Sequence, residues 1–217
     1  MKRKTGIFIA LMVALVLMAW GYAGHRSISS EIVLSFNSEM SGFTSWVGFM
    51  TDHASDADNR KGEDKDEGSR HYIDIDNYIG FVSNGRIPQS YDSAVEVYGQ
   101  SFVDDNGVLP WATLKTFDSL RNCMERYDFE KAMFFAADLG HYVADGHMPL
   151  HITANYDGQL TGNKGIHYRF ESTMINEHID EIQFTGKEAD YIPDVRNYIF
   201  SYLYKNYLYV DSIIAAD

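Results

Sequence analysis

The sequence contains a single cysteine, Cys123. A disulfide framework within the chain is therefore excluded, and stability must come from side-chain packing and from any bound metal. Positive charge is also scarce, because 18 Lys and Arg residues stand against 31 Asp and Glu residues, with a formal net charge of −13. Such a surface repels polyanions at long range. A polyanionic ligand would need bound cations to attract it locally.

Long hydrophobic runs are absent except at the N-terminus. Three basic residues at positions 2–4 precede the apolar residues 6–17, and Ala19 offers a small residue for cleavage. The run is shorter than the ~20 apolar residues that a spanning helix needs. The pattern therefore predicts a signal peptide over residues 1–19 rather than a membrane anchor. The mature chain would begin at Trp20, be secreted or periplasmic, and carry a charge of −16, because the lost charges are three positive ones.

Internal repeats, low-complexity segments and linkers are also absent, and strand-like alternation is weak. We therefore expect residues 20–217 to form one all-α domain, a multi-helix bundle. Four stretches have apolar residues at helical spacing: Ile28–Phe36, Pro110–Met124, Lys131–Asp145 with Asp128 as a candidate N-cap, and Val195–Ile214. Residues 55–70 and 152–166 contain glycines and no apolar period, which is typical of loops.

The side chains that can carry chemistry are histidines followed four positions later by a carboxylate. Chance predicts about one such pair in a chain of this composition, and the sequence has two, His141 with Asp145 and His167 with Glu171. Residues four apart lie on one face of a helix, so each pair can approach a single ion. Because the count barely exceeds chance, the interpretation depends on the surrounding sequence.

The segment HYVADGHMPLH, residues 141–151, supplies that context. An apolar helix is expected to end with His141 and Asp145 on its buried face, after which Gly146 and Pro149 would turn the chain and bring in His151. A carboxylate buried beside imidazoles is costly unless a cation compensates. Neutral imidazole and carboxylate are ligands that zinc accepts. We interpret the histidines and the aspartate as metal ligands.

The longer segment HYVADGHMPLHITAN resembles the signature of bacterial zinc-dependent phospholipase C and of the related single-strand-specific nucleases of S-one/P-one type. The other parts of that pattern follow in the same order: Trp20 and His25 in WGYAGH, Asp58 in the acidic segment, His71 in HYID, and His167 and Glu171 in GNKGIHYRFE. The similarity covers most of the chain from Trp20 to Glu171.

The resemblance implies three zinc ions and a ligand set for each. The first would be held by Asp58, His71, His141 and Asp145; the second by His151, His167 and Glu171; the third by the amino group and carbonyl oxygen of Trp20 with His25 and Asp145. Asp145 would bridge two ions. The signal-peptide pattern and the resemblance are independent arguments, and both make Trp20 the first residue of the mature chain.

The resemblance also implies a mechanism. Metal lowers the pKa of bound water from 15.7 to roughly 7 and so generates hydroxide at neutral pH. We expect hydroxide between the two ions that share Asp145 to attack phosphorus, with Asp58 and Asp145 as the catalytic carboxylates. No serine or cysteine triad competes with this interpretation. His53 and His147, beside the ligands, and His178, on a polar face, are expected to be supporting or surface residues.

The choice of substrate stays open between the two branches. Tyr72 and Asp74 match the positions where the nuclease branch stacks a base and binds its edge, which favours single-stranded nucleic acid or nucleotides. Glu171 favours the phospholipase branch, since the nucleases have Asp there. The nuclease Trp-Ala-Asp motif is altered, so either Asp56 or Asp58 could be the ligand. We favour a nuclease, with a phospholipase C as the alternative and a non-catalytic, zinc-stabilised binding protein as a third class. No stable protein partner is implied.

Overall fold

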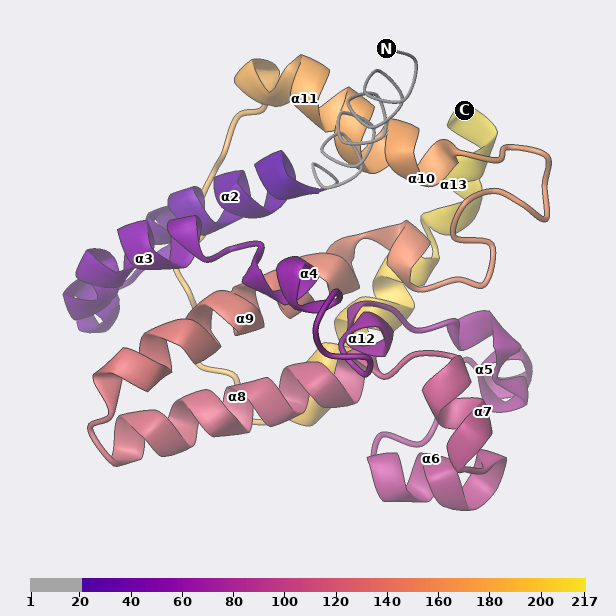
Figure 1. Cartoon of the computed structure of the whole chain (residues 1–217), viewed down its shortest axis with the longest axis horizontal. Coiled ribbons are helices and arrows are strands. Elements are labelled where there is room, and N and C mark those ends of the chain that lie inside the picture. The colour runs from indigo at the N-terminus through magenta and orange to yellow at the C-terminus, as the bar shows by residue number, and fades with distance from the viewer. Residues whose placement is uncertain (1–20) are drawn as a thin grey trace, which may run out of the picture.

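A computed structural model describes residues 21–217, so the expected signal peptide and the expected ligand Trp20 lie outside the described residues. All the regular elements within that range are helical (Figure 1), which confirms the all-α class. None of the described helices combines the length and the apolar character needed to cross a bilayer.

The centre of the fold is a hairpin of two long helices, α8 (Leu109–Glu125) and α9 (Phe129–His147), which run side by side in Figure 1. Pro110 lies in the first turn of α8, where the missing N–H removes no helical hydrogen bond. The Asp128 side chain caps α9 by accepting from the backbone N–H of Lys131 at 3.4 Å. Both helices were predicted with their caps.

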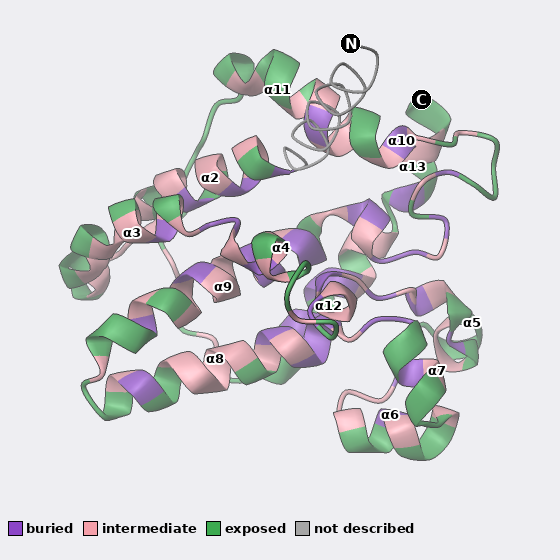
Figure 2. Cartoon of the chain, in the orientation of Figure 1, coloured by how far each residue is buried: buried purple, intermediate pink, exposed green. Residues whose placement is uncertain are grey.

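The C-terminal segment forms two helices, α12 (Val195–Tyr207) and α13 (Val210–Ala216), and α12 packs on this hairpin. The predicted single helix is interrupted at Leu208 and Tyr209. The main apolar cluster lies where α12 meets α8, α9 and the residues after His71, and its members are buried (Figure 2). Among its fully buried side chains are Ile73, Ile75, Tyr78, Leu109, Phe200 and Leu203.

On the other side of α9 lie α2 (Tyr22–Glu31) and α3 (Val47–Asp52), joined by the 3₁₀ segments η1 (Ile32–Ser35) and η2 (Ser38–Trp46). The predicted apolar helix face from Ile28 to Phe36 was wrong. Helix α2 ends at Glu31, Phe36 is extended, and the Ile28 side chain is 48% exposed. The residues that α2 buries are His25 and Ser29, so the polar face of this helix points inward.

Residues 55–70 are more ordered than predicted, since they contain α4 (Asp56–Arg60) and the start of η3 (Gly68–His71). A tertiary contact stabilises α4, because Arg60 donates two hydrogen bonds to the Asp138 carboxylate on α9. The next elements are η4 (Ile75–Asn77), α5 (Ile79–Asn84), α6 (Tyr91–Tyr98) and α7 (Gln100–Asp105).

Residues 152–165 form turns, as predicted, and lead into a continuous helical segment. This segment comprises α10 (Ile166–Tyr168), the π-helical η6 (Arg169–Met174), α11 (Ile175–His178) and the 3₁₀ turn η7 (Ile179–Glu181). Gly146 does not turn the chain, because α9 continues to His147 and the short η5 (Pro149–His151) follows. A Cβ on Gly146 would lie 2.7 Å from the Tyr202 ring, so this glycine allows α12 to approach α9.

Candidate metal centre

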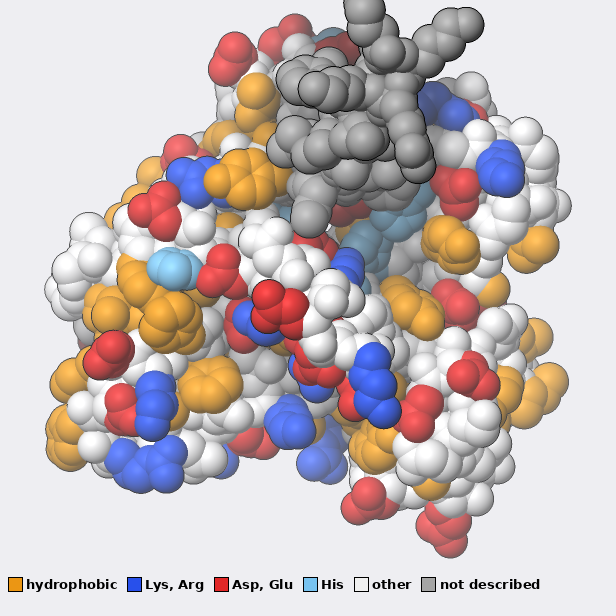
Figure 3. All heavy atoms as spheres, in the orientation of Figure 1, with side chains coloured by type: hydrophobic (Ala, Val, Ile, Leu, Met, Phe, Trp, Pro, Cys, Tyr) orange, Lys and Arg blue, Asp and Glu red, His pale blue; other side chains and the backbone are white. Residues whose placement is uncertain are grey.

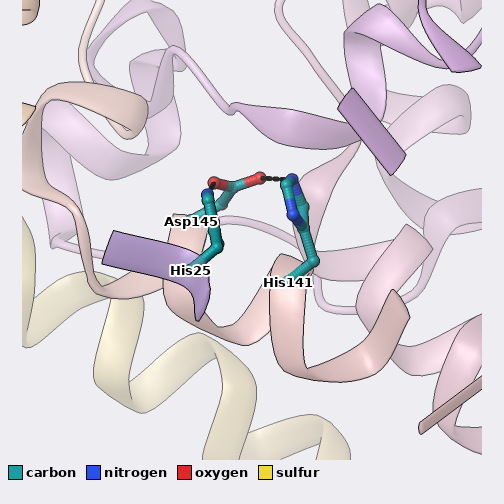
Figure 4. Close-up of side chains that lie close together, drawn as sticks. All are labelled: His25, His141 and Asp145. Atoms are coloured by element: carbon teal, nitrogen blue, oxygen red, sulfur yellow. Dashed lines mark ion pairs between the residues drawn. The ribbon is translucent and has the colours of Figure 1, made fainter. Parts of the chain in front are cut away.

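Helix α9 presents His141 and Asp145 to the interior, one turn apart and almost completely buried. The two oxygens of the Asp145 carboxylate face different histidines. Oδ2 lies 2.9 Å from His71 Nδ1 and 3.3 Å from His141 Nε2, whereas Oδ1 lies 3.4 Å from His25 Nε2 and 3.5 Å from His151 Nδ1. Figure 4 shows this carboxylate between the imidazoles of His25 and His141. Asp145 is therefore the common member of the cluster.

Backbone carbonyls orient three of the imidazoles. The Nδ1–H of His141 donates to Ala54 O at 2.7 Å, that of His151 to His71 O at 2.7 Å, and that of His167 to Tyr156 O at 3.1 Å. Because a carbonyl can only accept, each of these rings carries its proton on Nδ1 when neutral, and its Nε2 lone pair is left for a ligand. Metal-binding histidines are held in this way in proteins.

Three groups of side chains have ligand atoms close enough to share an ion. They are His25, His141 and Asp145; Asp58, His71 and His141; and His151, His167 and Glu171. The third group is the same set that the resemblance implied for one zinc. The second contains three of the four residues implied for another, and Asp145 Oδ2 is beside it. The first combines His25 and Asp145, as expected, with His141, while Trp20 is not described.

The spacing within the second group suits tetrahedral coordination. Ligand atoms ~2.0–2.1 Å from one zinc ion are about 3.3 Å apart in a tetrahedron. His141 Nε2 lies 3.0 Å from His71 Nδ1, and Asp58 Oδ1 lies 3.6 Å and 3.7 Å from these two nitrogens. Asp56 instead pairs with His53 Nδ1 at 2.6 Å. The structure thus brings Asp58, not Asp56, to the cluster.

The buried charges of the cluster stabilise one another. Burial alone would raise the pKa of Asp145, but His141 and His151 hold it well below its usual range. Burial alone would lower the pKa of His151, but the charge of Asp145 and the contact with Glu171 raise it to about 9. The carboxylates of Asp145 and Glu171 are therefore ionised and lie among imidazoles. Without metal, this arrangement favours protonated histidines, so a bound cation would displace protons.

The residues present fit a metal, because a buried nitrogen of the cluster has no hydrogen-bond partner. Among the described residues, His25 Nδ1, His71 Nε2 and His151 Nε2 are buried and make no hydrogen bond. His71 Nε2 lies 3.4 Å from Glu67 and His25 faces Asp145 through Nε2, so His151 Nε2 is the nitrogen that lies beside a group of candidate ligands. His151 Nε2 faces Glu171 Oε1 at 3.7 Å, and His167 Nε2 lies 2.9 Å from Glu171 Oε2. An unsatisfied buried polar atom costs about 1–3 kcal/mol. A cation placed among these atoms would remove that cost for His151.

Glu67 supports the cluster and was missed from the sequence. Its carboxylate is fully buried, accepts a short hydrogen bond from Tyr142 Oη, and lies 3.4 Å from His71 Nε2. Arg60 and Arg70 donate to its other oxygen. Burial alone would raise the pKa of Glu67, but these contacts lower it below its usual range. A carboxylate behind a metal-binding imidazole fixes the ring and makes it a stronger ligand.

Replacing Glu67 with Gln is expected to weaken zinc binding by about 10–100-fold. It should also lower the free energy of unfolding by roughly 1–3 kcal/mol. This loss is smaller than for breaking a fully buried ion pair, because Arg60 and Arg70, the partners of Glu67, are partly exposed. Competition with a chromophoric chelator and urea denaturation measure the two effects. Glu63→Gln, at an exposed position of the same segment, is the matched control. Equal zinc affinities in the two variants would contradict this role.

A pocket of about 330 Å³ opens beside the cluster and is lined by His71, His151 and His167. Tyr72 and Asp74, the predicted substrate-binding residues, line the same pocket, and Lys61 is the cation on its wall. Tyr72 Oη donates to Asp105 O at 3.3 Å, which holds the ring in place. Burial, with the nearby charge of Asp76, raises the pKa of Asp74 to about 6. The pocket therefore combines an aromatic ring, a carboxylate and a cation next to the candidate ligands.

The other histidines lie outside the three groups. His53 pairs with Asp56, the His147 ring stacks on Tyr202, and His178 is exposed beside Glu181. Cys123 is buried on α8, as expected for a core residue.

No protein-family model matches the chain, and neither a curated protein nor a solved structure shows significant similarity to it.

Proposed function

We propose that this chain is a zinc-dependent phosphodiesterase with three metal ions, and that it cleaves single-stranded nucleic acid and 3′-nucleotides. The convergence of imidazole nitrogens on the carboxylates of Asp145 and Glu171, with three of the rings oriented by backbone carbonyls, is the observation that carries the proposal. The His151 Nε2 atom, buried without a hydrogen bond, is unusual for a purely structural cluster.

Bound zinc would supply an activated water at neutral pH and stabilise the charge that develops on the phosphate. The chain's own residues have defined tasks around it. The two oxygens of Asp145 face separate sets of histidines, which allows the carboxylate to bridge two ions. Asp58 completes one set and interacts with Lys61 at 2.7 Å. Lys61 on the pocket wall can attract a phosphate despite the negative charge of the whole chain.

The proposed nucleic-acid substrate rests on the pocket. The Tyr72 ring lines it and is anchored through its hydroxyl, so a base can stack there at a low cost in ordering the side chain. The Asp74 carboxylate accepts no hydrogen bond from any residue in the described part of the chain, which leaves it for the edge of a base.

Replacing Tyr72 with Ala is expected to cost ~1–3 kcal/mol on nucleotide substrates, the value of one stacked base. An aryl phosphodiester without a base should be hydrolysed at the original rate. Comparing kcat/KM for the two substrates measures the difference. Tyr72→Phe keeps the ring but loses the hydrogen bond to Asp105 O, so it should lose less than Tyr72→Ala on nucleotide substrates. Equal losses on both substrates would make Tyr72 a purely structural residue.

A zinc-dependent phospholipase C is the second candidate. The specific observation in its favour is Glu171, which replaces the aspartate of the nuclease branch and lies 2.9 Å from His167 Nε2. The same pocket could then accept a phospholipid head group.

One zinc-loaded preparation tests both candidates and the third, non-catalytic class. Inductively coupled plasma analysis should give about three zinc ions per chain, the number that the resemblance implies. Chelation should abolish hydrolysis and lower the melting temperature, because the folded state loses a ligand that it binds preferentially. Rates on single-stranded RNA, a 3′-nucleotide and phosphatidylcholine then separate nuclease from phospholipase. A fully active metal-free protein would overturn the proposal, and a zinc-loaded protein without turnover would support the binding protein.

A further inference from the structure

Six aromatic side chains gather at the end of the molecule formed by the α8–α9 turn and by η2 and α3. We call this surface the aromatic tip; it consists of Phe43, Trp46, Phe49, Tyr127, Phe129 and Phe134. Edge contacts join the rings in two groups. Phe43, Trp46, Phe129 and Tyr127 form one, with centroids 6.3 Å apart for Trp46 and Phe129, and Phe49 and Phe134 form the other, with centroids 4.8 Å apart. Hydrophobic side chains are concentrated at this end in Figure 3.

Tyr127 is the most unusual member of the tip. It follows the last turn of α8 with φ of 60°, and it is the one non-glycine residue with positive φ in residues 21–217. The N–H of Asp128 donates to Cys123 O at 2.9 Å, so Tyr127 occupies the helix-ending position where glycine is preferred. Its ring is 79% exposed and therefore gains little from packing. A strained backbone that presents an exposed ring indicates that the ring serves a contact outside the chain.

The exposed area of the tip is too small for a stable dimer. Tyr127, Phe129 and Phe134 are 79%, 46% and 44% exposed. With ~200 Å² for each aromatic side chain, they offer roughly 350 Å². A stable protein interface needs about 800 Å² from each partner. The half-buried rings of the tip do not supply the difference.

The local charge differs from that of the whole chain. Residues 121–131 carry three basic and three acidic side chains, whereas the full sequence has a net charge of −13. Residues 38–52, which carry three further rings of the tip, add Glu39 and Asp52 and no basic residue, and Asp52 pairs with Arg26. The α8–α9 turn of the tip is therefore a locally neutral, aromatic surface on an acidic protein. Trp, Tyr and Phe with Arg and Lys beside them are characteristic of protein segments that lie in the head-group layer of a bilayer.

We propose that the aromatic tip docks the protein on a zwitterionic phospholipid surface. The tip lies at the start of α9 and the metal cluster at its end, sixteen residues further, or about 24 Å along the helix. Docking is thus separate from the metal site and does not depend on the proposed phosphodiesterase activity.

Flotation of the full chain with phosphatidylcholine vesicles tests the proposal. We expect the parent protein to float, and Tyr127→Gly combined with Phe129→Ser to reduce the partition coefficient at least about tenfold. Tyr127→Gly alone should raise the melting temperature or leave it unchanged, because glycine suits positive φ. The melting temperature of the double variant, measured in the same preparation, separates lost docking from unfolding. Tyr191→Ser, which removes a ring 90% exposed outside the tip, is the matched control and should float like the parent.

Vesicles with about a third of an anionic phospholipid should bind more weakly, because the acidic protein is repelled. A parent protein that does not float, or a double variant that floats equally well, would overturn the proposal. Sedimentation should show a monomer. A dimer that Tyr127→Gly dissociates would assign the tip to a second copy of the chain instead. Because flotation measures binding rather than hydrolysis, an inactive enzyme that still floats would leave docking supported.

Discussion

Asp145→Asn is expected to remove more than one zinc ion and nearly all turnover. Each oxygen of this carboxylate faces a different set of histidines, and an amide offers one neutral oxygen in place of two charged ones. Glu171, in contrast, faces only His151 and His167 among the described histidines. Glu171→Gln should therefore release about one ion, whereas Asp145→Asn should release two. Metal analysis after gel filtration, combined with kcat, measures the difference.

His178→Ala is the control for this prediction, because the ring is exposed and pairs only with Glu181. We expect no change in zinc content or rate. Comparable effects from Asp145→Asn and His178→Ala would mean that the cluster around α9 is not a metal site.

An extension before Trp20 is expected to remove one zinc ion and most activity. In the proposed third site the Trp20 amine must be free and unprotonated, and the pKa of an α-amino group is ordinarily ~7.7–8.0. An added residue converts that amine into an amide, a very poor ligand. The neighbouring residue supports a crowded site, since a Cβ on Gly21 would lie 2.9 Å from Glu171 Oε1 and 3.3 Å from the His25 ring.

Protein expressed with a removable N-terminal tag provides the test. Cleavage that exposes Trp20 should restore both zinc content and rate, whereas a tag at the C-terminus should have no effect. A protein with an intact extension that matches the mature enzyme would show that Trp20 is not a ligand. His25 and Asp145 would then need another partner in that group.

The sequence predicted the parts of the fold that depend on local signals. Pro110 and Asp128 mark helix starts through backbone chemistry, and the apolar period of α9 places His141 and Asp145 on one face. The four-residue spacing of His167 and Glu171 likewise brought two candidate ligands together. In each case the residues that determine the structure are close in the sequence.

The missed features depend on contacts between distant residues. Arg60 stabilises α4 through Asp138, 78 positions away, so the charged segment resembled a loop. The sequence around Glu67 is charged, which is typical of a solvated segment. Glu67 is buried in the fold because its carboxylate contacts Tyr142 on α9.

Tyr72 and Asp74 were assigned from the resemblance, and in the structure both line the same pocket.

The π-helical turn η6 has a consequence for evolutionary comparison. A π-turn holds one residue more than the α-helical turn that it replaces, and η6 contains Glu171. A related chain could therefore lose one residue between Glu171 and Ile175 and still keep the His167–Glu171 pair on one face. The α-helical turn that results still completes one revolution, so the residues beyond that point would keep their face of the helix. Alignments of distant relatives should thus allow a one-residue gap between Glu171 and Ile175. The spacing between Glu171 and the C-terminal helices should not be used to decide whether two chains belong to the same family.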